Sequence, residues 1–113
     1  NQNIKVIGVE PADSPFLTEG RAGSHRIEGI GAGFIPEILN TEIYDEIIPV
    51  KNEDSFRYGR MMGEQEGVLV GISSGAALCA AVEIAMRPEA KGKTIVVLFP
   101  DGGDRYLSTE LFA

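Results

Sequence analysis

Residues 68–77 read Val68-Leu69-Val70-Gly71-Ile72-Ser73-Ser74-Gly75-Ala76-Ala77. This segment passes from a short apolar run, through a turn bounded by two glycines, into an alanine-rich stretch. Such an order is typical of a strand that leads into a helix packed closely on a sheet. The pattern predicts a helix from about Ser74 to Met86, and Pro88 ends it because proline cannot continue a helix.

Strands are predicted on both sides of this unit. Downstream, Lys93 to Phe99 is the strongest strand prediction, because it is continuously apolar from Ile95 and ends in a glycine-rich turn. Upstream, Ile4 to Val9 is a nearly continuous apolar run, as in strands buried on both faces of a parallel sheet. Glu42 to Val50 also looks extended, with Pro49 placing it at a sheet edge or a strand end.

Helical signals lie between the predicted strands. Asn52 is expected to cap a helix that runs to about Glu66, with Gly67 as its stop, and Ile35 to Leu39 is expected to form one helical turn. We therefore predict an α/β fold, with part of a mostly parallel sheet and flanking helices. In such sheets ligands bind beyond the carboxyl ends of the strands, so the two glycine-rich turns that follow apolar runs are candidates for the wall of a site.

The composition is that of an ordinary globular chain. Its 113 residues fit one domain, 43% of them are hydrophobic, and a formal net charge of −7 argues against nucleic-acid binding. No apolar run is long enough for a transmembrane helix. His25 and Cys79 are the only histidine and cysteine, which argues against a metal site and fits a cytosolic setting. Because the sequence begins Asn1-Gln2-Asn3 without a methionine and then enters an apolar run at once, we expect it to begin inside a longer protein.

The first candidate motif is the loop Gly29-Ile30-Gly31-Ala32-Gly33. Glycines at alternate positions let the backbone bend sharply and approach a ligand without a Cβ in the way. The loop fails as a dinucleotide fingerprint, because Phe34 stands where the third glycine belongs and no strong strand precedes it. From the residues alone, a structural glycine turn and a ligand-contacting loop both remain open.

The second motif is the turn at residues 71–75. Ser73 or Ser74 could serve simply as the N-cap of the following helix, where serine is favoured. The same residues fit the nucleophile elbow G-x-S-x-G of α/β-hydrolases. That fold places its histidine after the serine, whereas His25 precedes Ser73, so a serine nucleophile is disfavoured.

The third motif is Pro100-Asp101-Gly102-Gly103-Asp104-Arg105, directly after the strongest predicted strand. It needs no function as a strand-end turn, and its charged residues could form a local network. Its place at the carboxyl end of a strand also makes it a site candidate. Of the lone residues, we interpret Cys79 as a small buried hydrophobe and His25 as solvent-facing or locally hydrogen-bonded.

Taken together, three segments resemble the cysteine synthases (O-acetylserine sulfhydrylases). They are residues 25–36, which read His-Arg-Ile-Glu-Gly-Ile-Gly-Ala-Gly-Phe-Ile-Pro, residues 71–77, and residues 100–109. Their order and spacing agree with that family, and the resemblance extends along essentially the whole chain. The run Gly-Ile-Gly-Ala-Gly-Phe favours cysteine synthase over relatives such as cystathionine β-synthase.

The resemblance implies fold-type II of the pyridoxal-phosphate enzymes, with residues 1–113 as the C-terminal segment of the cofactor-binding large domain. It implies the β-replacement of O-acetyl-L-serine with sulfide, which gives L-cysteine and acetate. Ser73 matches the serine that hydrogen-bonds the pyridine nitrogen, and Pro100 and Asp101 match a turn beside the pyridine edge. Gly29, Ile30, Gly31, Ala32 and Gly33 match a loop that borders the mouth of the active site.

The resemblance also implies a homodimer in the cytoplasm and, as a partner, the C-terminal tail of serine acetyltransferase. The family's Schiff-base lysine and its loops for substrate carboxylate and phosphate lie upstream in full-length members, and no matching segment occurs in these residues. The resemblance therefore assigns no catalytic residue to this chain and implies that it is inactive alone. A stand-alone, non-catalytic binding module is the alternative from a different functional class.

Overall fold

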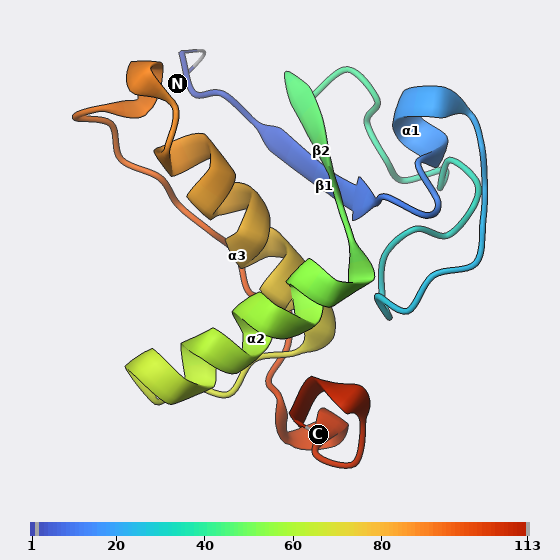
Figure 1. The fold of residues 1–113 in the computed structure, drawn as a ribbon. Coiled ribbons are helices and arrows are strands. Elements are labelled where there is room, and N and C mark those ends of the chain that lie inside the picture. The colour runs from blue at the N-terminus through green and yellow to red at the C-terminus, as the bar shows by residue number, and fades with distance from the viewer. Residues whose placement is uncertain (2, 113) are drawn as a thin grey trace.

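The structure is a computed structural model that describes residues 1 and 3–112. The strands and α-helices follow in the order β1 (Ile7–Pro11), α1 (Phe16–Glu19), β2 (Glu46–Val50), α2 (Asn52–Glu66) and α3 (Ile72–Ala85). Short 3-10 helices then follow at Pro88–Ala90, Asp104–Tyr106 and Glu110–Phe112. Figure 1 shows the two strands side by side above α2, with the C-terminal turns on the far side of that helix.

The sheet within the described residues consists of β1 and β2, which pair in parallel. Ile7 lies opposite Glu46, and Pro11 lies opposite Val50. Both strands were predicted, although each begins later than its apolar pattern. Pro49 is exposed within β2, as expected for a proline at a sheet edge. Helix α3 packs on both strands, so the predicted α/β class with parallel pairing is confirmed.

The two long helices form where the sequence predicted them. Helix α2 ends at Gly67, which adopts a left-handed conformation with φ of 71° and donates its N–H to the Gly63 carbonyl. The prediction that Asn52 caps α2 is wrong, because Lys51 is the N-cap. The Asn52 side chain instead accepts a hydrogen bond from the backbone N–H of Arg26 and donates one to Asp13.

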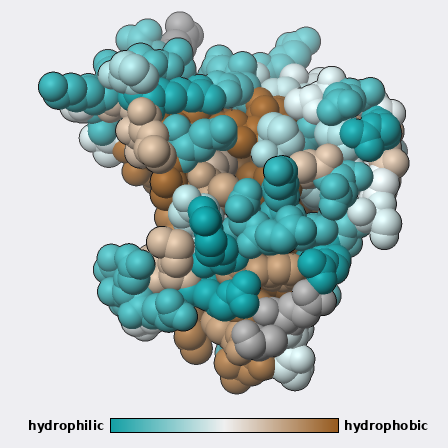
Figure 2. Space-filling view, viewed as in Figure 1, coloured by the Kyte–Doolittle hydropathy of each residue, from teal (hydrophilic) through white to brown (hydrophobic). Residues whose placement is uncertain are grey.

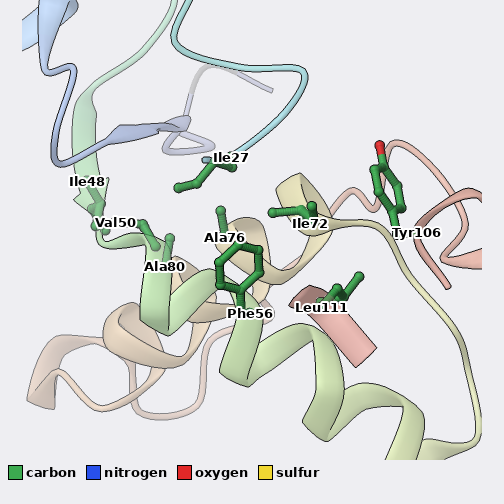
Figure 3. Close-up of a cluster of buried hydrophobic side chains, with 9 residues drawn as sticks. All are labelled: Ile27, Ile48, Val50, Phe56, Ile72, Ala76, Ala80, Tyr106 and Leu111. Atoms are coloured by element: carbon green, nitrogen blue, oxygen red, sulfur yellow. The ribbon is translucent and has the colours of Figure 1, made fainter. Parts of the chain in front are cut away.

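The core lies where α2 and α3 meet the sheet. Figure 3 shows Ala76 and Ala80 of α3 beside Phe56 of α2, with Ile27 reaching the same cluster from the long loop after α1. A Cβ on Gly75 would overlap the backbone carbonyl of Ser55, so the absence of a side chain lets the helices approach closely. The small residues of α3 thus allow the close packing that the sequence predicted.

The strongest strand prediction, Lys93 to Phe99, is wrong for this structure. These residues run in extended form beside α3 (Figure 1), but they make no strand pairing with any described segment. Val96 is 91% exposed and Leu98 is 78% exposed. A strand needs a neighbouring backbone to satisfy its N–H and C=O groups, and an apolar pattern alone does not supply one. The nearest regular pairing is an isolated bridge between Val70 and Gly102.

The helical turn predicted over Ile35 to Leu39 is reduced to one hydrogen-bonded turn. Leu39 N–H donates to the Pro36 carbonyl at 3.0 Å, and no helix forms. Ile38 is 98% exposed, so this segment has no buried face that would stabilise a helix. In the described part of the chain, no helix has the length and apolar character needed to cross a membrane.

Candidate functional site

The turn at residues 71–75 and the turn at Pro100–Asp101 meet at the start of α3. Gly71 is the N-cap of α3, and its N–H donates to the Asp101 carbonyl at 3.2 Å. A Cβ on Gly71 would overlap the Asp101 carboxylate, which explains why glycine is required there. The interpretation of Ser73 or Ser74 as the N-cap is therefore wrong, because both lie inside the first turn of the helix.

Hydrogen bonds hold the Asp101 carboxylate within the protein. Ser74 Oγ donates to Oδ1 at 3.3 Å, and Tyr106 Oη donates to Oδ2 at 2.7 Å. Tyr106 is buried at the side of the core cluster, with its hydroxyl directed away from that cluster (Figure 3). The hydrogen bond to Asp101, followed by burial, raises the pKa of Tyr106. Two motifs that are distant in sequence thus form one polar network.

The Ser73 hydroxyl is left available beside this network. Ser73 is 8% exposed, and no group within residues 1 and 3–112 forms a hydrogen bond with its Oγ. No buried side-chain polar atom of those residues lacks a partner, so the Ser73 hydroxyl must reach the surface. It lies in the first turn of α3, at the positive end of the helix dipole. The position offers one neutral hydrogen-bond donor to a ligand.

The glycine loop lies against this hydroxyl. Gly29, Gly31 and Gly33 have φ values of 96°, 65° and 82°, so each adopts a backbone conformation that strongly favours glycine. A Cβ on Gly29 would lie 3.9 Å from Ser73 Oγ. The structural interpretation of the alternating glycines is therefore confirmed. The loop also adjoins the candidate donor, as a ligand-contacting loop would.

A cleft of about 280 Å³ opens between these elements. It is lined by Glu28, which precedes Gly29, by Ile72, which precedes Ser73, and by His25, Arg26, Phe56 and Thr109. Gly31, Ala32 and Gly33 line a second, more apolar cavity of about 140 Å³ on another side of the loop. The residues that directly precede Gly29 and Ser73 thus line the first cleft, and Gly31 to Gly33 line the second.

The remaining predicted residues differ in their surroundings. Pro100 is exposed at the end of the extended segment 93–99, and Ile30 packs against the core cluster. Cys79 is half-buried, and burial raises the pKa of its thiol, as expected for a small hydrophobe rather than a reactive cysteine. In the described part of the chain, no cluster of His, Cys, Asp or Glu could hold a metal ion.

Sequence reasoning missed two residues that shape the site. Ser74 and Tyr106 bind the Asp101 carboxylate. They lie 27 and 5 residues from Asp101 in the sequence, so no local pattern connects the three residues. The local charge pattern predicts only a network of Asp101 with Asp104 and Arg105. His25 is locally hydrogen-bonded, as one of its two interpretations stated, and both of its ring nitrogens are engaged. It is therefore not placed to activate Ser73 as a hydrolase nucleophile.

The donor set suits an uncharged heteroaromatic nitrogen such as that of pyridoxal phosphate. Ser73 supplies a neutral hydroxyl that is open to the surface, and the loop at Gly29 leaves space beside it because a side chain is absent. The nearby Asp101 carboxylate is occupied by Ser74 and Tyr106. A carboxylate that could pair with the ring nitrogen would favour protonation of that nitrogen. Ser74 and Tyr106 bind the Asp101 carboxylate instead.

Comparisons with known proteins identify the relatives of this chain. The family model for pyridoxal-phosphate dependent enzymes matches residues 1–101. A cysteine synthase of Staphylococcus aureus is 50% identical over 111 residues, which cover 98% of this chain and 36% of the relative. The solved cysteine synthase of Entamoeba histolytica matches with a TM-score of 0.96 and 47% identity, covering 99% of this chain and 33% of that one.

A second solved structure, an O-acetylserine-dependent cystathionine β-synthase of Helicobacter pylori, matches with a TM-score of 0.87 and 42% identity, over 99% of this chain and 36% of that one. The chain thus spans about a third of the length of these relatives. The resemblance to cysteine synthases is confirmed, as are the fold class and the cofactor of the family. This chain belongs to the family of pyridoxal-phosphate-dependent enzymes.

Proposed function

We propose that this chain is the C-terminal segment of the large domain of a cysteine synthase, which makes L-cysteine and acetate from O-acetyl-L-serine and sulfide. The observation that carries the proposal is the Ser73 hydroxyl, which has no hydrogen-bond partner among the described residues and adjoins the glycine loop at Gly29. The 50% identity to a cysteine synthase supports the same conclusion.

When bound, pyridoxal phosphate supplies an electron sink for reactions at the α-carbon of an amino acid. Ser73 would hold the ring by donating a hydrogen bond to its pyridine nitrogen. Gly29, Ile30, Gly31, Ala32 and Gly33 would border the mouth through which O-acetyl-L-serine enters. Pro100 and Asp101 would lie beside the pyridine edge, with the Asp101 carboxylate held by Ser74 and Tyr106.

The electrostatics of the site favour β-replacement over transamination. A hydroxyl donor carries no negative charge, and the start of α3 is the positive end of a helix dipole, so neither stabilises a protonated pyridine nitrogen. An unprotonated ring withdraws electrons less strongly. By leaving the ring nitrogen without a stabilising negative charge, the residues around Ser73 would disfavour transamination.

The wider assignments are part of the same proposal. The complete protein would be a cytoplasmic homodimer, and the C-terminal tail of serine acetyltransferase would be its partner. The Schiff-base lysine would come from outside residues 1–113, so the chain alone would be inactive. Cystathionine β-synthase activity is the second candidate, because the Helicobacter pylori enzyme of that name shares the fold. Its TM-score of 0.87, against 0.96 for the Entamoeba histolytica cysteine synthase, favours the first.

A chimera tests whether the chain can perform this role. In the chimera, the 111 aligned residues of the Staphylococcus aureus cysteine synthase are replaced by their counterparts from this chain. We expect the chimera to bind pyridoxal phosphate, seen in its visible absorbance, and to form cysteine from O-acetyl-L-serine and sulfide. A chimera that folds, judged by circular dichroism, but binds no cofactor would contradict the proposal.

The stand-alone binding module is tested separately. The coding sequence upstream of Asn1 should continue in frame and encode a lysine in the context of the family's Schiff-base lysine. A stop codon directly upstream, or an open frame without that lysine, would favour the non-catalytic module. The two tests answer different questions. The chimera shows whether these residues can serve in a cysteine synthase, and the gene sequence shows whether they are part of a longer protein.

A further inference from the structure

The His25 ring contacts the backbone on both sides of Gly29, at Ile27 and at Gly31. Its Nδ1 lies 3.1 Å from the backbone nitrogen of Ile27, which donates to it. Its Nε2 lies 3.0 Å from the carbonyl oxygen of Gly31. A backbone N–H can only donate and a carbonyl can only accept, so Nδ1 must carry the lone pair and Nε2 must carry the hydrogen. The two contacts together require the neutral Nε2–H tautomer.

The ring and the end of β1 also confine Gly31. A Cβ on Gly31 would lie 2.7 Å from His25 Nε2 and 2.5 Å from Pro11 Cγ, distances that a real side chain could not adopt. Gly31 is therefore held between a strand end and the imidazole. The ring also lines the same cleft as Ile72, the residue before Ser73. His25 thus binds the glycine loop at Gly31 and shares a cleft with the residue that precedes Ser73.

We propose that His25, as the neutral Nε2–H tautomer, is a positioning residue that fastens the loop Gly29–Gly33 beside Ser73. The catalytic consequence rests on the proposed function, whereas the tautomer does not. His25 takes no part in proton transfer, because both of its ring nitrogens are committed to the backbone. His25 affects the reaction by positioning Gly29, where an added Cβ would lie 3.9 Å from Ser73 Oγ.

Nuclear magnetic resonance of the chimera, prepared without cofactor, tests the tautomer directly. His25 is the only histidine that residues 1–113 contribute, and the long-range proton–nitrogen correlations of its ring are assigned by their loss in His25→Gln. At neutral pH we expect the pattern of an Nε2–H imidazole. The Nδ1–H tautomer, the imidazolium, or a rapid average of the two neutral tautomers would overturn the proposal. This measurement needs neither cofactor nor activity.

Three substitutions in the chimera test the positioning role. His25→Leu removes both hydrogen bonds, His25→Gln keeps an amide N–H that can reach the Gly31 carbonyl, and His25→Asn keeps an acceptor for the Ile27 N–H. We expect His25→Leu to raise the KM for O-acetyl-L-serine about tenfold while kcat changes by less than about threefold, because a displaced loop weakens binding more than chemistry. His25→Gln should restore most of the KM.

The outcomes separate this inference from the proposed function. The unsubstituted chimera must bind cofactor and form cysteine, and its failure would count against the function while the resonance experiment still decides the tautomer. With an active chimera, an unchanged KM in His25→Leu would overturn the positioning role. So would a kcat lost equally in all three variants, since that result would identify a proton-transfer group. Cofactor absorbance and circular dichroism identify variants that have not folded.

Discussion

Single residues determine what the site can do. Ser73 presents a neutral donor, and the Asp101 carboxylate at the start of the same helix is occupied by Ser74 and Tyr106. The motifs around Ser73 and Gly29–Gly33 are recognisable in the sequence, because glycine and serine in these patterns are local signals. The role of Ser73 toward a cofactor follows only from the resemblance to cysteine synthases and stays a prediction. The sequence did not predict the roles of Ser74 and Tyr106, because hydrogen bonds between distant segments leave no periodic trace in a sequence.

The hydrogen bond from Tyr106 to Asp101 contributes measurably to stability. Tyr106→Phe removes a buried donor, so we expect the free energy of unfolding to fall by about 1–2 kcal/mol in urea denaturation of the chimera. Tyr58→Phe is the matched control, because no hydrogen bond to its hydroxyl is present in the described part of the chain, and it should change stability by a few tenths of that amount. Equal effects of the two substitutions would refute the assignment.

The same pair predicts a pH dependence. The pKa of Tyr106 is raised above its ordinary value of 10.0, first by the hydrogen bond to Asp101. A group with a raised pKa in the folded state contributes its full stabilisation at pH values below its unfolded-state pKa. This contribution is lost as the pH rises through the folded-state pKa. The difference in stability between the unsubstituted chimera and its Tyr106→Phe variant should therefore be constant from neutral pH to about pH 10 and shrink above it.

At the scale of elements, the contact between α2 and α3 holds the site in place. Local signals predicted β1, β2, α2 and α3, because apolar runs, glycine stops and helix-forming stretches lie within each element. The segment 93–99 was predicted as a strand on the same kind of evidence, and it is unpaired here because pairing depends on a second backbone. The limit of sequence reasoning therefore lies between elements rather than within them.

The close approach of α2 and α3 predicts an asymmetry between two glycines. Gly75→Ala would push a Cβ into the Ser55 carbonyl, so we expect a loss of about 2–3 kcal/mol in the free energy of unfolding. Gly59→Ala meets first the Cδ1 of Leu111, at 2.8 Å, which is the end of a side chain rather than a backbone atom. Gly59→Ala should therefore cost less. A smaller loss for Gly75→Ala than for Gly59→Ala in urea denaturation would contradict the packing described.

On the scale of the whole molecule, apolar side chains are exposed along the extended segment 93–99. Figure 2 shows hydrophobic surface in the hollow on the left of the view, where Figure 1 has α3 and the extended segment. Ile95, Val96 and Leu98, which belong to this extended segment, are all exposed. An extended apolar segment with unpaired backbone groups readily pairs with another chain.

We therefore expect the isolated chain to self-associate, with an average mass that rises with concentration in light scattering after gel filtration. Val96→Lys should reduce the association, because it places a charge on a side chain that is 91% exposed. Thr94→Lys adds the same charge at a neighbouring exposed polar residue and should reduce it less. A chain that remains monomeric at all concentrations would refute association through this surface.

The protonation state of the cofactor nitrogen tests the central claim most directly. In the chimera loaded with pyridoxal phosphate labelled with ¹⁵N in the ring, we predict the chemical shift of an unprotonated, hydrogen-bonded nitrogen, because Ser73 is a neutral donor. Ser73→Asp should move that shift to the protonated range, since a carboxylate stabilises the charged ring. A protonated nitrogen in the unsubstituted chimera, or the same shift in both proteins, would contradict the account.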